Sequence, residues 1–268
     1  GPFVLKEWKP HQHILVGQSP TYWDRATVRL TAIRFYPIDS MDAEERAYRA
    51  GQLHGTWALP LSKILPFQQE KSPALRIDPI LETFFFRLNV RRTPLDDTRI
   101  RQALSLALDR DAIAGKILPG GRQPAPTFVS PLLKGYTPPG RRAYDLAAAR
   151  QLLTDAGHPG GAGLPPIEIL YNNSEILRLV AEAIQQMWQR DLGLDIRLVN
   201  QEFKVVFANR RAGDYQILLG SWTADYLDAT TFLDMWRSDS GNNHTGWSDL
   251  AYDALSNRAN TIADPAAR

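Results

Sequence analysis

The chain of 268 residues contains no cysteine and only three methionines. Without thiols it cannot form disulfides, thiolate zinc sites, iron–sulfur clusters or a cysteine nucleophile. No apolar run approaches the roughly 20 residues that a membrane-spanning helix needs. Basic and acidic residues nearly balance, at 31 and 29, so net charge favours neither nucleic acid nor an anionic membrane as a partner. Hydrophobic residues make up 44% of the chain, which is enough for a substantial core.

Common signatures of catalysis and cofactor binding are also missing. The sequence has no G-x-S-x-G, no phosphate-binding G-x-x-x-x-G-K-[ST] and no dinucleotide fingerprint. His11 and His13 would share one face of a strand, but no third metal ligand lies nearby, so we interpret them as strand residues. The neighbouring carboxylates Asp96 and Asp97 are explained by the start of a helix. We therefore expect no enzyme activity, no metal site and no cofactor.

The first part of the chain is predicted to be rich in strands. Alternating patterns predict strands at 3–8, 13–16, 29–36 and, less regularly, 53–59, with helices at 42–50 and 62–70. Residues 81–89 contain three consecutive phenylalanines without a turn residue, which predicts a strand buried on both faces.

A helix is expected from about Ile100 to Ile117. The Pro- and Gly-rich stretch 119–142 follows it and is interpreted as a long ordered loop, with a linker as the alternative.

From residue 143 strands and helices alternate with short connections. Helices are predicted at 146–156, 174–192, 202–211, 228–236 and 249–263, and strands at 167–171, 194–199 and 215–219. A β-α-β-α-β order of this kind indicates a doubly wound parallel α/β unit.

The residues after the 215–219 strand are the most informative of the chain. Trp222, Asp225 and Tyr226 follow a buried strand, and ligands of open α/β sheets collect at the carboxyl ends of strands. A carboxylate beside an indole could hold a cationic group against an aromatic wall. The alternative is structural: Asp225 would cap the next helix and Trp222 would fill the core.

Several motifs together resemble the extracellular solute-binding proteins of peptide ABC importers (family 5), in particular the periplasmic oligopeptide-binding branch. The most specific one runs from Pro94 to Leu104 and continues with Ala107-Leu108-Asp109-Arg110. Weaker matches are 1–8, 19–23 and 48–53. The oligopeptide-binding branch is favoured by the two stretches 198–204 and 222–226. The resemblance covers nearly the whole chain and keeps the family's order.

The resemblance implies a two-lobed, type II periplasmic binding protein fold. Residues 1–80 are expected to be part of lobe I and residues 81–268 most of the α/β lobe II, with a hinge near 81–89. Such proteins also carry a long N-terminal portion and a C-terminal return into lobe I, so we expect this chain to be a fragment.

The resemblance also implies a ligand site. The expected ligand-binding residues are Asp225, Trp222, Phe203, Arg210, Arg211, Asn242 and Trp57. In such proteins the carboxylate equivalent to Asp225 pairs with the α-ammonium of a peptide, and Trp222 and Phe203 form walls of side-chain pockets. The aromatic at position 203 is usually tryptophan, so a phenylalanine there leaves the preference of that pocket open.

The basic residues Arg210 and Arg211 are expected to face the ligand's C-terminal carboxylate or main chain. Their alternative is a solvated last helical turn, where the helix dipole favours cations. Phe203 is equally compatible with a core position. Asn242 either binds peptide main chain or makes a turn. Trp57 is assigned to the lobe I side by position alone.

The predicted function is that of the substrate-binding component of an ABC peptide importer, which clamps a short peptide between two lobes. Its partners would be a short peptide and the membrane permease subunits. We expect a periplasmic or cell-surface lipoprotein monomer, with the signal segment absent from this chain. Alternatives are another solute on the same scaffold (a dipeptide, nickel chelate, opine or oligosaccharide) or a truncated remnant that acts as an interaction domain. An enzyme on this scaffold is the least favoured interpretation.

Overall fold

The computed structural model describes residues 1–125, 127–133, 135–137 and 143–264. The chain divides into two compact units, Gly1–Leu75 and Arg76–Arg268. This division falls slightly before the expected 80/81 boundary, and the assignment of the units to two lobes stays a prediction, as does the hinge at 81–89. In the described part of the chain, no helix combines the length and the apolar character needed to cross a bilayer.

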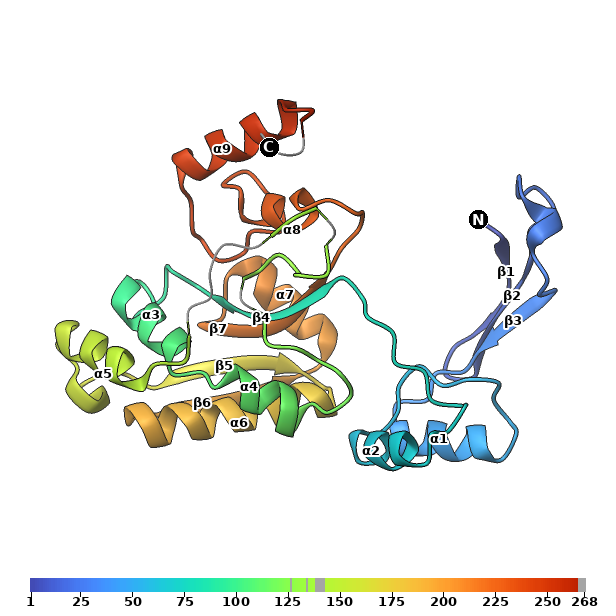
Figure 1. Cartoon of the computed structure of the whole chain (residues 1–268), viewed down its shortest axis with the longest axis horizontal. Coiled ribbons are helices and arrows are strands. Elements are labelled where there is room, and N and C mark those ends of the chain that lie inside the picture. The colour runs from blue at the N-terminus through green and yellow to red at the C-terminus, as the bar shows by residue number, and fades with distance from the viewer. Residues whose placement is uncertain (126, 134, 138–142, 265–268) are drawn as a thin grey trace. The chain divides into compact units, whose positions relative to one another are not determined.

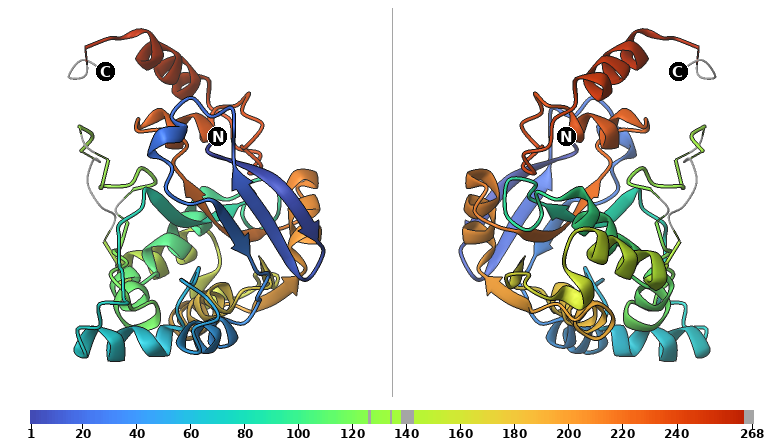
Figure 2. Two further views of the ribbon diagram at one scale, coloured as in Figure 1. Left: turned by 90° about the vertical axis from the view of Figure 1, so that its right-hand side faces the viewer. Right: turned by 90° about the vertical axis from the view of Figure 1, so that its left-hand side faces the viewer.

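The first unit is built on a three-stranded antiparallel sheet in the order β1-β2-β3, drawn in blue in Figure 2. Its strands are β1 (Phe3–Lys9), β2 (His13–Gln18) and β3 (Ala32–Phe35), and its helices are α1 (Met41–Arg49) and α2 (Leu61–Gln69). Ser40 begins α1, since its hydroxyl accepts a hydrogen bond from the Ala43 N–H. The predicted strand at 53–59 is wrong, because these residues form bends and irregular backbone without ladder partners.

The second unit is built on a four-stranded sheet in the order β4-β7-β5-β6 (Figure 1). The strands are β4 (Glu82–Leu88), β5 (Ile167–Asn172), β6 (Ile196–Gln201) and β7 (Ile217–Thr223). β5 pairs in parallel with both β6 and β7, while β4 pairs with β7 in the antiparallel sense. The predicted doubly wound unit is therefore confirmed.

The crossover helices of this unit cover opposite faces of the sheet. α6 (Glu175–Leu192) packs on one face through Ile184 and Trp188. α7 (Phe203–Ala212) packs on the other, where Val206 joins a cluster with Leu170 and Leu218. Residues 169, 170 and 171 of β5 are all buried, as expected for a strand covered on both sides.

The remaining helices are α3 (Thr98–Leu106), α4 (Arg110–Ala112), α5 (Leu146–Asp155), α8 (Thr230–Leu233) and α9 (Leu250–Thr261). α3 packs against α5, whereas α9 stands away from the sheet and has no buried residue (Figure 1). The expected helix from Ile100 to Ile117 is broken. The Asp109 carboxylate accepts a hydrogen bond from the Ala112 N–H and starts a new turn, which continues as a π-helical segment, Ile113–Ile117.

Four further expectations need correction or restriction. The strand at 81–89 is not buried on both faces: β4 lies at the edge of the sheet, and Phe84 is 37% exposed. The strand expected at 215–219 runs on through Trp222 to Thr223, because β4 pairs with it over that length. The expected 228–236 helix is only α8, followed by a 3₁₀ turn at Asp234–Trp236. Residues 126, 134 and 138–142 of the expected 119–142 loop lie outside the described residues, and the others form neither helix nor strand.

Candidate functional site

The second unit has a topological switch point between β5 and β6. The connection after β5 leads to α6 on one face of the sheet, and the connection after β6 leads to α7 on the other. Such diverging connections leave a crevice at the carboxyl ends of the two strands, where ligands of open α/β sheets bind. A hollow of about 210 Å³ opens beside this point, from Asn172 at the end of β5 and Leu177 of α6 along α7 to residues of β4 and β7. We call it the switch-point hollow.

The walls of the switch-point hollow are mostly apolar. They are formed by Phe84, Leu177, Phe203, Val206, Phe207 and Leu218. Phe203 is the first residue of α7, where the Glu202 carboxylate accepts the Lys204 N–H and fixes the start of the helix. Phe203 is 61% exposed, and its ring centroid lies 6.2 Å from that of Phe207, one helical turn further on. Phe203 is therefore a wall residue and not a core residue.

Two arginines give the hollow a positive charge. Arg87 of β4 and Arg210 of α7 both line it, although they are far apart in the sequence. The Arg87 guanidinium lies over the Phe85 ring, with Cζ 4.5 Å from the ring centroid, and donates a weak hydrogen bond to the Met235 sulfur at 3.7 Å. Arg210 stacks in the same way on Phe207, at 4.3 Å.

The electrostatics of these groups follow from burial and from their proximity. Burial, followed by the positive charge of Arg210, lowers the pKa of Arg87 to about 10. Burial and the neighbouring Arg211 lower the pKa of Arg210 as well. Burial raises the pKa of Tyr215 to about 12, and its hydroxyl donates to the His244 carbonyl at 2.5 Å. Burial, then Arg210 and Arg87, lowers the pKa of His244. The side chains around the hollow are therefore cationic at neutral pH. Tyr215 stays protonated at this pH and adds no negative charge.

Of the seven residues expected from the sequence, the structure brings Phe203 and Arg210 to this hollow. Arg211 is exposed, and its guanidinium stacks on Phe207 at 4.5 Å without lining the hollow. Sequence reasoning missed Arg87, Asn172 and Ser221, which supply the hollow's other polar side chains. One signal was available for Arg87: it is a charge inside the otherwise apolar stretch 84–88.

Asp225 lies in the loop that follows β7, and its side chain is exposed. Its backbone N–H donates to the Thr231 hydroxyl at 2.9 Å, which fixes the loop against α8. The alternative helix-capping role belongs to Asp228, whose carboxylate accepts hydrogen bonds from the Thr230 N–H and hydroxyl. No hydrogen bond or ion pair within the described part of the chain engages the Asp225 carboxylate.

Trp222 is half-buried, and its indole N–H donates to the Thr231 carbonyl at 2.7 Å. The indole packs against a cluster that contains Val129, Leu133 and Phe232. These contacts support the alternative of a packing role and leave the N–H already occupied.

The last two expected residues lie elsewhere. Asn242 is exposed in a turn, where its N–H donates to the Ser240 hydroxyl, and the neighbouring Asn243 amide binds the Trp236, Arg237 and Trp247 carbonyls. Trp57, in the first unit, is 98% exposed, and its backbone N–H donates to the Glu44 carboxylate.

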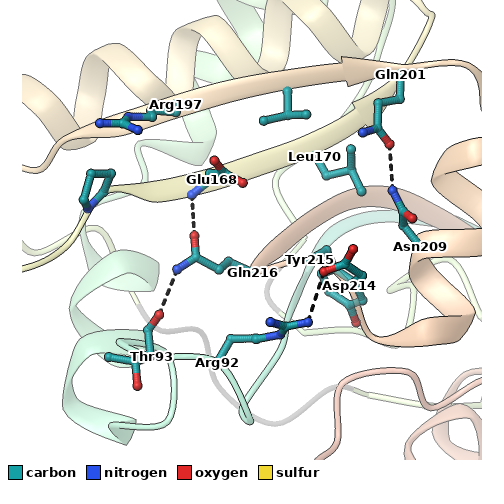
Figure 3. Close-up of a pocket in the computed structure, with 12 residues that line it drawn as sticks. Arg92, Thr93, Glu168, Leu170, Arg197, Gln201, Asn209, Asp214, Tyr215 and Gln216 are labelled. Atoms are coloured by element: carbon teal, nitrogen blue, oxygen red, sulfur yellow. Dashed lines mark hydrogen bonds and ion pairs between the residues drawn. The ribbon is translucent and has the colours of Figure 1, made fainter.

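A second, larger hollow of about 600 Å³ runs along β5 and β6, from Glu168 and Arg197 to Gln201 at the end of β6 (Figure 3). It contains none of the residues expected from the sequence. Its polar groups largely satisfy one another: Gln216 bridges the Thr93 carbonyl and the Glu168 N–H, and Arg92 pairs with Asp214 at 3.1 Å. This internal satisfaction favours the switch-point hollow as the ligand site.

No group of three or more His, Asp or Glu side chains within the described ranges is placed to hold a metal ion.

The comparison with known proteins decides the family. Residues 1–244 match the bacterial extracellular solute-binding proteins, family 5 (middle region). The chain belongs to this family. Two family relatives are the periplasmic oligopeptide-binding protein OppA of Salmonella typhimurium, 30% identical, and the probable deoxycholate-binding periplasmic protein YgiS of Escherichia coli, 34% identical. Each match covers 100% of this chain, with 50% of OppA and 51% of YgiS.

The structural comparison agrees with this family. The Escherichia coli murein tripeptide binding protein MppA superposes with a TM-score of 0.92 at 31% identity, over 100% of this chain and 53% of that one. The mixed α/β fold is thus that of type II periplasmic binding proteins. The chain spans about half the length of the curated relatives it matches. The family consists of solute-binding proteins rather than enzymes.

Proposed function

We propose that this chain is the ligand-holding part of the solute-binding component of an ABC peptide importer, and that it binds a short peptide. The observation that carries the proposal is the switch-point hollow, in which Phe203 and Arg210 of α7 converge with Arg87 of β4 beside Asn172 at the end of β5. It is supported by the names of the relatives, which include oligopeptide- and murein-tripeptide-binding proteins. The component would act as a monomer in the periplasm or at the cell surface and deliver its ligand to membrane permease subunits.

In this proposal Asp225 binds the peptide's α-ammonium group. Its carboxylate is exposed on a loop that Thr231 and Asp228 hold in place, so it is available to a ligand. Phe203 and Trp222 supply apolar walls, and Arg210 faces a ligand carboxylate. Arg211, Asn242 and Trp57 contribute from outside the hollow. Ligand binding would stabilise a closed arrangement of two lobes that pivot near residues 81–89.

A second candidate ligand is a non-peptide carboxylate solute. It is favoured by the identity of 34% with a relative named as probably deoxycholate-binding and by the apolar walls of the hollow above two guanidinium groups. The two candidates differ in what they require of the protein, because only a peptide uses an α-ammonium group at Asp225.

The test is a calorimetric titration of the chain with a mixed tripeptide pool and with the same pool N-acetylated. We expect binding heat from the free-amine pool and at least roughly tenfold weaker binding of the acetylated pool, since acetylation removes the charge that Asp225 recognises. Equal binding of both pools would contradict the role of Asp225. If neither peptide pool gives binding heat but a bile-acid carboxylate does, the second candidate is favoured.

A further inference from the structure

The Arg87 side chain is a buried charge without a counter-ion. It is 3% exposed, and its Nε is buried without a hydrogen-bond partner. The Met235 sulfur is a poor substitute, since a thioether is only a weak acceptor. Buried guanidinium groups are normally paired, because the loss of hydration has to be offset by a carboxylate or by strong acceptors. An unpaired one in a ligand hollow indicates that its partner comes from outside the chain.

Arg210 makes the arrangement still less favourable without a ligand. Its Nε is also buried and unpartnered, and its charge lowers the pKa of Arg87. With a pKa of about 10, Arg87 stays charged at neutral pH, so two like charges face one hollow. No carboxylate of the described residues forms an ion pair with either arginine. A bound anion would remove both the repulsion and the unmet hydrogen-bonding capacity.

The shape of the hollow restricts the anion. Gly220 gives the Arg87 guanidinium its place over β7, because a Cβ atom there would lie only 2.9 Å from Arg87 Nη1. The charged groups lie beside the apolar side chains of Phe203, Phe207 and Leu177, in about 210 Å³. Such a lining fits a carboxylate carried on a short aliphatic stem. Guanidinium groups bind carboxylates through two parallel N–H···O bonds, and two arginines can share one carboxylate.

We propose that the switch-point hollow is a pocket for the acidic side chain of a ligand peptide, with Arg87 and Arg210 as its carboxylate-binding residues. The proposal rests on the proposed function and narrows it to peptides that carry glutamate or aspartate. The C-terminal carboxylate of a peptide has the same chemistry, so the experiment has to separate the two sources.

The main test uses C-terminally amidated tripeptides with a free amine and with Glu or Gln at each position in turn. In such peptides the side chain is the only carboxylate. We expect the best Glu peptide to bind the wild-type chain roughly tenfold or more tightly than its Gln counterpart. Arg87→Met keeps the unbranched apolar stem but removes the guanidinium and its charge, and should reduce this preference to within about twofold. Arg258→Gln, an exposed charge on α9 with no side-chain partner in the described chain, serves as the matched control and should keep the preference.

Two results of this titration would overturn the proposal. One is a preference for Glu that Arg87→Met leaves unchanged. The other is a result in which the C-terminal carboxylate, and not the side chain, carries the effect. In that case a Gln peptide binds more tightly with a free C-terminus than with an amidated one, Arg87→Met abolishes this difference, and replacing Gln by Glu does not increase affinity. The second result would assign the hollow to the chain terminus of the ligand.

A second measurement is independent of peptide binding. Thermal unfolding is followed in sodium acetate and in sodium chloride at equal ionic strength and pH 7. An anion that binds only the folded state raises Tm, so acetate should raise the Tm of wild type and of Arg258→Gln more than that of Arg87→Met. If no peptide binds but this difference is present, the proposed function fails for this chain while the anion site stands. Equal shifts in all variants would remove the anion site itself.

Discussion

Replacing Trp188 by alanine should destabilise the second unit by about 3–5 kcal/mol, a large part of the stability of an average domain. Trp188 lies on α6, is 1% exposed, and packs with its ring centroid 6.3 Å from that of Phe86. Its indole N–H also donates to the Leu104 carbonyl at 3.0 Å, so truncation leaves a cavity and an unpaired buried acceptor. Denaturant unfolding monitored by circular dichroism measures the loss.

Two controls separate these contributions. Trp188→Phe keeps an aromatic ring but removes the N–H, and should cost clearly less than the alanine variant. Trp57→Ala makes the same substitution at a side chain that is 98% exposed and should change the unfolding free energy by no more than about 0.5 kcal/mol. Similar losses for Trp188→Ala and Trp57→Ala would show that the packing of α6 on the sheet is not as described.

Asp225→Asn should weaken the binding of free tripeptides by roughly thirtyfold or more, which corresponds to about 2 kcal/mol or more for a charged hydrogen-bonded pair. The variant keeps the size of the side chain, and the loop stays anchored by the Thr231 hydroxyl. N-acetylated peptides lack the ammonium charge, so their weaker affinity should hardly change. Competition calorimetry with free and acetylated forms of one tripeptide gives both numbers.

The matched control for Asp225→Asn is Asp214→Asn. It makes the same charge change in the second, larger hollow, where Asp214 forms an exposed pair with Arg92. Such pairs contribute little to stability, and neither Arg92 nor Asp214 lines the switch-point hollow. Peptide affinity should therefore stay within about twofold of wild type. Equal losses of free and acetylated peptides in Asp225→Asn would contradict the pairing with an ammonium group.

The features that could be predicted from the sequence are mainly those that the pattern of neighbouring residues determines. The alternation of strands and helices from residue 143 can be predicted because apolar residues recur with a different spacing in a helix than in a strand. Phe203 and Arg210 converge for the same reason: they lie seven residues apart on one helix, two turns on one face, directly after a strand.

What could not be predicted depends on pairing between distant segments. Arg87 reaches the switch-point hollow only because β4 adds to the sheet antiparallel to β7, in a register that puts Arg87 opposite Leu218. No local signal fixes that register. The same pairing extends β7 through Trp222, so this residue lies on a strand and not on a loop, and its indole packs on the cluster around Phe232.

Side-chain competition for the backbone accounts for another error. A continuous helix from Ile100 to Ile117 fits the apolar spacing, but the Asp109 carboxylate offers the Ala112 N–H an alternative partner and interrupts it. The role of Asp225 stays a prediction, since its carboxylate is exposed and only a ligand can show what it binds.

The most direct test of the claim that ligands bind at the switch-point hollow is to record arginine Nε–Hε NMR signals during titration with an amidated Glu tripeptide. Signals are assigned by their absence in Arg87→Met and in the corresponding Arg210 variant. We predict the largest shifts for Arg87 and Arg210, whose Nε groups are now unpartnered, and little change for Arg92 and Arg197 at the other hollow. Shifts confined to Arg92 and Arg197, with Arg87 and Arg210 unmoved at saturation, would contradict the account.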